Sequence, residues 1–299
     1  MSSQAATRRR GLFLVLAATF LWSLAGLFAR LIPHLDFGTV LFFRGLFGGA
    51  CGLALAYLEW RLGRLDARRL LSPLAPLVVV LAAFAISAYV GALMATTVAD
   101  VLVIYATLPF FAAGMAFALT GERASRRTLI AASLAMVGIV VMAAGGLGHG
   151  RLLGQSLALA MTVTFALLVV LQRRDPTLPV APINSLAALV AAGFGYSVST
   201  HAPVGAFDLG VLFVFGATTI ALAFALFMEG AKDVPSAEAA LVSMLDIVMG
   251  PLWVLLAFGE TPDFTTLIGG GFVIAAAVWR LAPELRRPSR TVAPAVAPL

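Results

Sequence analysis

Charged residues are scarce in this sequence of 299 residues. Asp, Glu, Lys and Arg make up 11% of the chain, whereas apolar residues make up 61% and the mean hydropathy is +1.02. A soluble domain carries about 25% charged residues, so this composition excludes an ordinary soluble fold and leaves no room for a soluble catalytic module. The sequence therefore predicts an integral membrane protein whose solvent is the lipid bilayer.

The motifs of common enzyme classes are also missing. The single cysteine, Cys51, excludes an intramolecular disulfide. The three histidines, His34, His149 and His201, are isolated and lack metal-ligand spacing. No HExxH, GxSxG or Walker A motif occurs, and the glycine-rich run at 145–150 follows an apolar segment rather than a strand. We therefore predict no enzyme activity, no cofactor and no metal.

Long apolar runs take up most of the chain. A helix needs roughly 20 apolar residues to cross the hydrocarbon core, and a lone strand there would leave backbone groups unpaired. The period-two alternation of a β-barrel is absent. The first run is too long for a signal-peptide core and is predicted to stay as an uncleaved helix. The runs predict ten transmembrane helices, at residues 11–31, 38–58, 74–96, 98–119, 128–146, 152–171, 183–200, 209–230, 236–258 and 264–279.

The basic residues indicate the orientation of these helices. Seventeen of the 20 Lys and Arg residues lie in loops or tails on one side of the predicted bundle, Arg30 and Arg151 lie on the other side, and Arg44 lies within a span. Lys and Arg gather on the cytoplasmic side of a membrane. Both tails are therefore predicted to be cytoplasmic, in a bacterial-type inner (plasma) membrane, and the net charge of +6 reflects topology with no nucleic-acid partner.

The second half of the chain repeats part of the first. Gly121-Glu122 and Gly259-Glu260 lie 138 positions apart, as do Thr128-Leu129-Ile130 and Thr266-Leu267-Ile268. Five helices is an odd number, so the second copy is predicted to enter the membrane upside down, a design found in transporters. The predicted parts are a cytoplasmic tail at 1–10, a five-helix repeat at 11–146, an inverted five-helix repeat at 147–281 and a cytoplasmic tail at 282–299.

Several short motifs carry a resemblance to one transporter group. These motifs are Leu21-Trp22-Ser23, Phe43-Arg44, Gly121-Glu122, Lys232, Pro235-Ser236-Ala237 and Gly259-Glu260. The sequence resembles the drug/metabolite transporter superfamily of the EamA type, and within it the YddG-type exporters of aromatic amino acids. This resemblance implies an all-α membrane fold of ten helices, in two inverted repeats around a central cavity that opens alternately to each side. One departure is Leu245-Asp246-Ile247, where the family often has Leu-Glu-Pro.

Two charged residues stand within predicted spans. A charge at the membrane centre is costly, so Asp246 and Arg44 should face the interior or a wet cavity. Asp246 either contacts a substrate ammonium or exchanges a proton, or it pairs with Arg44 to fix two helices. Arg44 either attracts a substrate carboxylate or makes a structural ion pair.

Other side chains are candidates for the cavity wall. Trp22, Tyr89, Tyr105 and Trp253 fall within spans, where an aromatic ring either stacks on a planar solute or packs between helices. Met244, two residues before Asp246, is a candidate for a soft apolar contact. These residues, with Arg44 and Asp246, form the predicted substrate cavity.

Six charged residues near the predicted helix ends are candidates for caps or gates. Asp100 follows Thr97 at capping-box spacing, and Glu238 has the equivalent position in the second repeat. Glu122 and Glu260 close their helices, as caps or as ion-pair partners. Glu229 and Lys232 are three residues apart, a spacing that permits an ion pair.

The sequence leaves the substrate and the assembly open. Aromatic or neutral amino acids follow from the resemblance, and drug-like cations or other metabolites are the alternative within the superfamily. A membrane scaffold without flux is a third hypothesis. Glycines at 45–52 and 269–271 predict close helix packing, within a monomer by default or in a dimer through 264–279.

Overall fold

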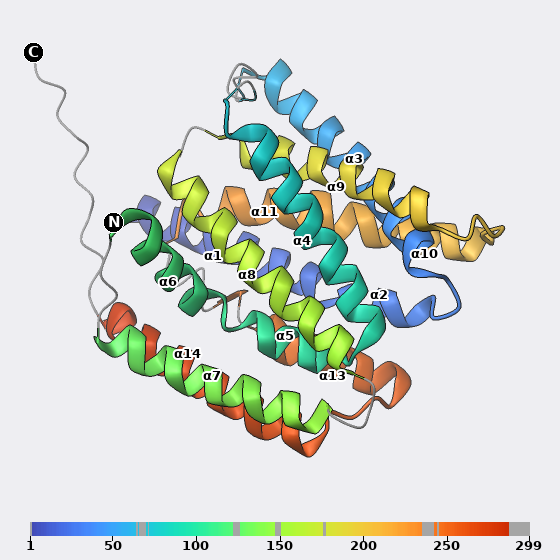
Figure 1. Ribbon diagram of the computed structural model, residues 1–299. Coiled ribbons are helices and arrows are strands. Elements are labelled where there is room, and N and C mark those ends of the chain that lie inside the picture. The colour runs from blue at the N-terminus through green and yellow to red at the C-terminus, as the bar shows by residue number, and fades with distance from the viewer. Residues whose placement is uncertain are drawn as a thin grey trace, which may run out of the picture.

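The computed structural model describes residues 2–63, 65, 70, 72–121, 126–146, 151–175, 178–234, 242–243 and 245–286 (Figure 1). Within these ranges the chain is helical and contains no strand. The helices are α1 (Ser2–Ser23), α2 (Ala25–Leu31), α3 (Phe37–Arg61), α4 (Ala75–Ala95), α5 (Val98–Tyr105), α6 (Leu108–Thr120), α7 (Arg126–Gly146), α8 (Leu152–Arg174), α9 (Val180–Val198), α10 (Ala206–Gly216), η2 (Ala217–Leu222), α11 (Ala223–Gly230), α13 (Asp246–Phe258) and α14 (Phe264–Arg286).

Seven of the predicted spans are helical segments long and apolar enough to cross a bilayer. They are Ala6–Leu31, Phe37–Arg61, Ala75–Ala95, Val98–Leu119, Leu152–Leu171, Val180–Val198 and Ala206–Gly230. The other three predicted spans contain the helices α7, α13 and α14, so the total of ten stays a prediction. The helix α1 begins at Ser2 and α14 continues to Arg286, and the predicted bounds of the two cytoplasmic tails stay a prediction.

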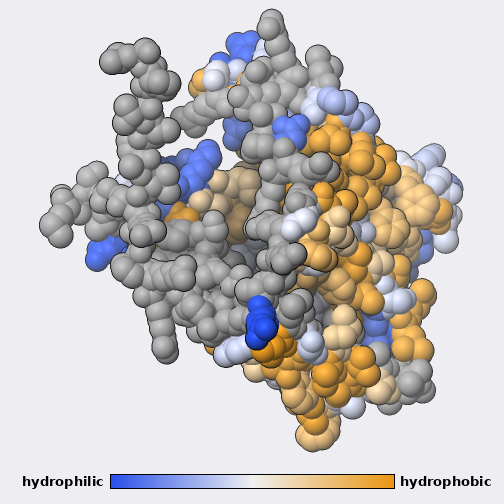
Figure 2. Space-filling view, turned by 60° about the vertical axis from the view of Figure 1, so that its left-hand side comes forward, coloured by the Kyte–Doolittle hydropathy of each residue, from blue (hydrophilic) through white to orange (hydrophobic). Residues whose placement is uncertain are grey.

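Large apolar side chains cover much of the outside of the bundle. Phe264 is 76% exposed, Leu256 70% and Phe13 70%. Figure 2 shows the same feature as broad orange areas on one side of the molecule. A water-soluble protein rarely exposes large apolar patches, so this surface fits contact with lipid.

The helix ends divide into two groups. We call the end with Arg10, Arg61 and Lys232 the basic end, and the end with Arg30 and Glu260 the far end. In Figure 1 the basic end lies at the upper left, where α3 and α8 finish, and the far end lies at the lower right. Figure 2, in which the left-hand side of Figure 1 comes forward, shows a hollow with apolar atoms in it.

Glycines let two helices from different halves of the chain lie in close contact. A Cβ at Gly45 would lie 2.6 Å from the carbonyl oxygen of Ala188, and a Cβ at Gly195 would lie 2.6 Å from the backbone nitrogen of Phe42. The small residues thus bring the backbones of α3 and α9 together, as in other membrane helix pairs. The predicted packing role of the glycines at 45–52 is therefore an intramolecular one.

The second repeat reproduces the helix boundaries of the first. The helices α6 and α13 begin 138 residues apart, at Leu108 and Asp246, and they end at Thr120 and Phe258, again 138 residues apart. Both α6 and α13 end in a glycine with left-handed backbone, with φ of 71° at Gly121 and 69° at Gly259. Such a C-cap favours glycine because it has no Cβ.

Three spans are irregular in their middle. The segment 98–119 breaks between α5 and α6, where Pro109 lacks the backbone N–H that a continuous helix needs. A turn at Leu245 precedes α13, although Ile247 stands where the resemblance leads us to expect proline. The third irregularity is the π-helix η2, which joins α10 to α11 without a gap. Such π-turns within α-helices frequently occur at functional sites.

Candidate functional site

The side chain of Arg44 is buried in the bundle. It comes from the middle of α3 and is 4% exposed. The guanidinium carbon lies 4.4 Å from the centre of the Phe215 ring and 5.7 Å from that of Tyr89. Nη2 donates to the hydroxyl of Thr219 over 3.2 Å. Among the described residues, Nε and Nη1 find no hydrogen-bond partner, which is costly for a buried charge.

Thr219 is fixed by the π-helix in which it lies. Its hydroxyl donates to the carbonyl of Phe215 over 2.6 Å, so its lone pairs face Arg44. In η2 the N–H of Ala223 bonds to the carbonyl of Thr218, five residues back. The carbonyl of Thr219 instead accepts a hydrogen bond from Trp22 Nε1 over 3.0 Å. One residue thus joins α1 and α3 to η2, and nothing in the sequence pattern singled it out.

Asp246 lies at the first position of α13, after the break in the chain. It is 8% exposed, and its carboxylate accepts a hydrogen bond from the N–H of Ile247. A carboxylate there complements the dipole of α13. Tyr89 is within electrostatic range of both Arg44 and Asp246, and Tyr105 is within range of Asp246 and Tyr89. The structure therefore gathers four predicted cavity residues from α3, α4, α5 and α13.

Arg44 and Asp246 do not form the structural ion pair that was one of the two alternatives. Both residues are described, and no salt bridge connects them in these ranges. Tyr89 is instead within electrostatic range of both. Arg44 and Asp246 are thus each buried without the other as its ion-pair partner.

The two predicted cavity tryptophans contact other helices. Trp22 packs on Phe227 with ring centres 5.2 Å apart. Trp253 donates from Nε1 to the hydroxyl of Ser23 over 2.9 Å and meets Phe20 edge-on at 5.8 Å. Both rings are half-buried, so each keeps some free surface. Met244 lies outside the described residues.

A second polar cluster lies at the far end, where Arg30 pairs with Glu260. Arg30 Nε donates to Glu260 Oε2 over 2.7 Å. The same guanidinium donates to the carbonyls of Leu93 and Thr96, at 2.7 and 2.8 Å, where α4 ends. A cation is favourable at a helix C-terminus. Arg30 therefore fastens α2 and α4 to the end of α13, and Glu260 is an ion-pair partner as predicted.

Asp100 forms the buried centre of this far-end cluster. Its backbone N–H donates to Thr97, which confirms Thr97 as the N-cap of α5. The carboxylate does more than the predicted capping. It accepts hydrogen bonds from Thr96 at 2.7 Å, Thr266 at 2.6 Å and Gln155 at 3.2 Å. It thereby joins α5 to α8 and α14, a role that the capping motif did not indicate.

Arg151 adds a further cation to the far-end cluster. Its Nη1 lies 3.7 Å from Asp100 Oδ2, and its Nη2 forms an ion pair with Asp263. The sequence placed Arg30 and Arg151 on one side of the membrane without indicating their partners. Together with Asp100, Glu260 and Asp263 they tie the first half of the chain to the second at this end.

The predicted pair at the basic end is also present. Lys232 Nζ lies 2.7 Å from Glu229 Oε2, and Arg10 Nη2 lies 3.2 Å from Glu229 Oε1. These side chains are largely exposed, so the ion pairs contribute little stability. Glu122 and Glu238, the other two predicted cap or gate residues, lie outside the described residues.

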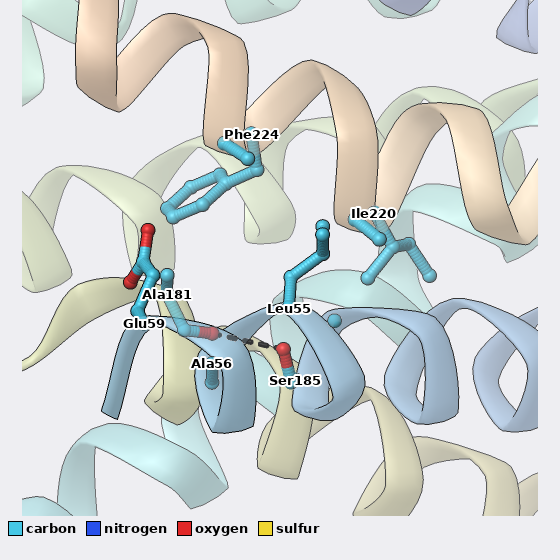
Figure 3. Close-up of a pocket in the computed structure, with 10 residues that line it drawn as sticks. Leu55, Ala56, Glu59, Ala181, Ser185, Ile220 and Phe224 are labelled. Atoms are coloured by element: carbon cyan, nitrogen blue, oxygen red, sulfur yellow. Dashed lines mark hydrogen bonds between the residues drawn. The ribbon is translucent and has the colours of Figure 1, made fainter. Parts of the chain in front are cut away.

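A shallow pocket on the side of the bundle is a separate feature (Figure 3). It lies between α3, α9, η2 and α11, and its wall is apolar apart from Glu59 and Ser185. The Ser185 hydroxyl already donates to the carbonyl of Ala181 over 2.9 Å. The pocket thus offers a solute few polar contacts, and the cluster around Arg44 is the better candidate.

Comparisons with known proteins agree with this fold. The sequence model of the EamA-like transporter family matches residues 9–144 and again residues 152–281. A crystal structure titled only "Crystal structure of protein" has a TM-score of 0.65 and 20% identity, over 94% of this chain and 99% of that chain. At that identity the likeness concerns the fold alone. No curated protein matches the chain significantly.

Proposed function

The chain belongs to the EamA-like transporter family, and from this membership we propose that it is a secondary-type carrier. It exports small metabolites, with aromatic or neutral amino acids as the preferred class. The basic end faces the cytoplasm of a bacterial-type cell, since Lys and Arg gather on that side. The substrate cavity is formed by Trp22, Arg44, Tyr89, Tyr105, Met244, Asp246 and Trp253.

The observation that carries this proposal is the separation of Arg44 from Asp246. Both side chains are at least nine-tenths buried, they do not pair with each other, and Tyr89 lies 5.7 Å from the Arg44 guanidinium and within electrostatic range of Asp246. Ionisable residues inside a membrane protein usually mark a solute or ion path. An amino acid offers one charge of each sign, and its aromatic ring suits the Tyr89 and Tyr105 side chains.

Alternating access is the mechanism that this arrangement supports. The far end is held together by the Arg30–Glu260 ion pair and by the Asp100 cluster. The side of the molecule that faces the viewer in Figure 2 is hollowed. The near-equivalent helices α6–α7 and α13–α14 give the bundle two related halves. We propose that the far-end ion pairs break when the carrier opens outward, while the Glu229–Lys232 pair and the predicted gate residues Glu122 and Glu238 act on the cytoplasmic side.

Counterflow in liposomes tests the proposal. Purified protein is reconstituted with a high internal concentration of one amino acid, and uptake of the labelled amino acid is followed for all twenty in turn. Uptake of Trp, Phe or Tyr at least several-fold above empty liposomes is expected. Absence of counterflow for every amino acid would contradict the substrate class.

Drug-like planar cations are the second candidate, because Asp246 is a buried acid in the same cluster. Asp246→Asn distinguishes the two. It abolishes transport of a cation, whose charge needs the carboxylate, whereas a neutral amino acid keeps part of its rate. Counterflow of no solute at all, other metabolites included, would support the non-transporting scaffold.

A further inference from the structure

We propose that Arg44 and Thr219 form a preformed binding site for the carboxylate of the solute. Thr219 of the π-helix η2 holds the Arg44 guanidinium, and the remaining N–H groups of that guanidinium bind the solute. The inference deepens the proposed function and rests on it. Thr219 acts here as a positioning residue, since it touches Arg44 rather than the solute.

The close approach of η2 to α3 makes this arrangement possible. A Cβ at Gly48 would lie 2.8 Å from the carbonyl oxygen of Gly216, and a Cβ at Gly216 would lie 2.8 Å from the backbone nitrogen of Gly48. Only residues without a side chain allow that contact. Thr219, one turn beyond Gly216, therefore reaches Arg44 on the neighbouring helix.

The hydrogen bonds of Thr219 leave it one role toward Arg44. Its hydroxyl proton is used on the carbonyl of Phe215, so the oxygen can only accept from Nη2 of Arg44. The π-turn also frees its carbonyl for Trp22. The residue is held from both sides, and it fixes the plane of the guanidinium between Phe215 and Tyr89.

The remaining donors define the ligand. Nε and Nη1 of Arg44 are buried and lack partners among the described residues. A planar guanidinium binds a carboxylate through two parallel hydrogen bonds, here from the second N–H of Nη2, which the bond to Thr219 leaves over, together with the N–H of either Nε or Nη1. Of the described Lys and Arg residues, Arg44 alone contacts Phe215, Tyr89 and Thr219. One cation, with Asp246 acting on the adjacent Tyr89, suits a monoanion paired with an ammonium rather than a phosphate dianion.

The test compares ligands that differ only in the carboxylate. Purified full-length protein is titrated calorimetrically with tryptophan and phenylalanine and with their amides, which keep the ring and the ammonium. We expect the wild-type protein to bind the acids at least about tenfold more tightly than the amides, because hydrogen bonds to a charged group are lost with the amide. Arg44→Gln and Arg44→Lys remove this preference.

Variants on η2 separate positioning from folding. Thr219→Val removes the hydroxyl at constant shape and reduces the preference for the acid severalfold, whereas Thr219→Ser restores it. Thr218→Val is the matched control, because the Thr218 hydroxyl bonds to Val214 within its own helix, and it keeps the wild-type preference. Monodisperse elution of each variant shows that it is folded.

Two results would overturn the inference. One is an unchanged acid-over-amide preference in folded Arg44→Gln, and the other is equal binding of acids and amides by the wild-type protein. Counterflow of a planar cation in that second case would leave the carrier function standing. Absence of counterflow for every solute would instead remove the proposed function itself.

Discussion

Arg30 and Glu260, 230 residues apart in sequence, form an ion pair at 2.7 Å that joins α2 to the end of α13. Their side chains are 22% and 26% exposed, so water only partly screens the pair. The Arg30 guanidinium also covers the last carbonyls of α4, at Leu93 and Thr96. Arg30 lies in the first segment that the family model matches and Glu260 lies in the second, so the ion pair connects the two segments at one end of the bundle.

Breaking this pair should favour the outward-open form. In Glu260→Gln the attraction to Arg30 is lost while the size is kept, and labelling of a far-end cysteine, introduced at Thr97 in a Cys51→Ala background, should speed up severalfold in sealed vesicles. The charge-exchanged variant with Arg30→Glu and Glu260→Arg restores only part of the protection. Its glutamate cannot donate to the carbonyls of Leu93 and Thr96.

The exposed pair at the basic end provides the control for this experiment. Lys232→Gln removes the pair with Glu229, in which the lysine side chain is 69% exposed. Such pairs contribute about 0–1 kcal/mol, so labelling at the far end should stay at the wild-type rate. Equal labelling of Glu260→Gln and wild type would show that the Arg30–Glu260 pair does not hold the far end closed.

Asp100 should be the acid whose neutralisation costs most stability at the far end. In Asp100→Asn one amide group faces the donors Thr96, Thr266 and Gln155, and the charge opposite Arg151 disappears. Leaving buried donors unmet costs about 1–3 kcal/mol each. Thermal unfolding in detergent should show a midpoint lowered by several degrees. Glu59→Gln, an exposed acid with the same change of charge, should unfold at the wild-type temperature.

Residues 126 and 264 begin equivalent helices and test the inverted arrangement directly. In a Cys51→Ala background, Arg126→Cys should react with an impermeant maleimide only from the cytoplasmic side, and Phe264→Cys only from the outside. Both positions are exposed first residues of their helices, α7 and α14. Reaction of both from the same compartment would rule out two halves of opposite orientation.

The sequence predicted those features of the fold that the lipid environment or the local backbone geometry determines. Seven apolar runs predicted membrane-length helices correctly, and the repeat at Gly121 and Gly259 corresponds to two left-handed helix ends. The glycines of α3 similarly predicted close packing on a neighbouring helix. These features depend on residues close together in the chain or on composition alone.

The partners of charged residues could not be predicted in the same way. Arg30 meets Glu260, and Asp100 meets Gln155 and Thr266, only after distant helices have packed. Thr219 gives no local signal, since threonine is common in membrane helices and the π-turn that frees its carbonyl has no sequence signature here. Capping spacing therefore explained Thr97 but not the carboxylate of Asp100.

The crossing of α3 and α9 gives a matched pair of glycine variants. A Cβ at Gly45 would lie 2.6 Å from the carbonyl oxygen of Ala188, a backbone atom that cannot move without displacing α9. Gly45→Ala should therefore destabilise the protein by about 1–3 kcal/mol, as overpacking does. Gly193, on α9 itself, has no atom within 4 Å of an added Cβ, so Gly193→Ala should be neutral or slightly stabilising because alanine favours the helix.

Thermal unfolding of the two variants in the same detergent compares them. Equal midpoints would mean that the backbones of α3 and α9 lie farther apart than this crossing requires. A lower midpoint for Gly45→Ala alone would show that the glycine surface of α3 packs against Ala188 and Ala192 of the same chain. That surface is then not available for contact with a second copy.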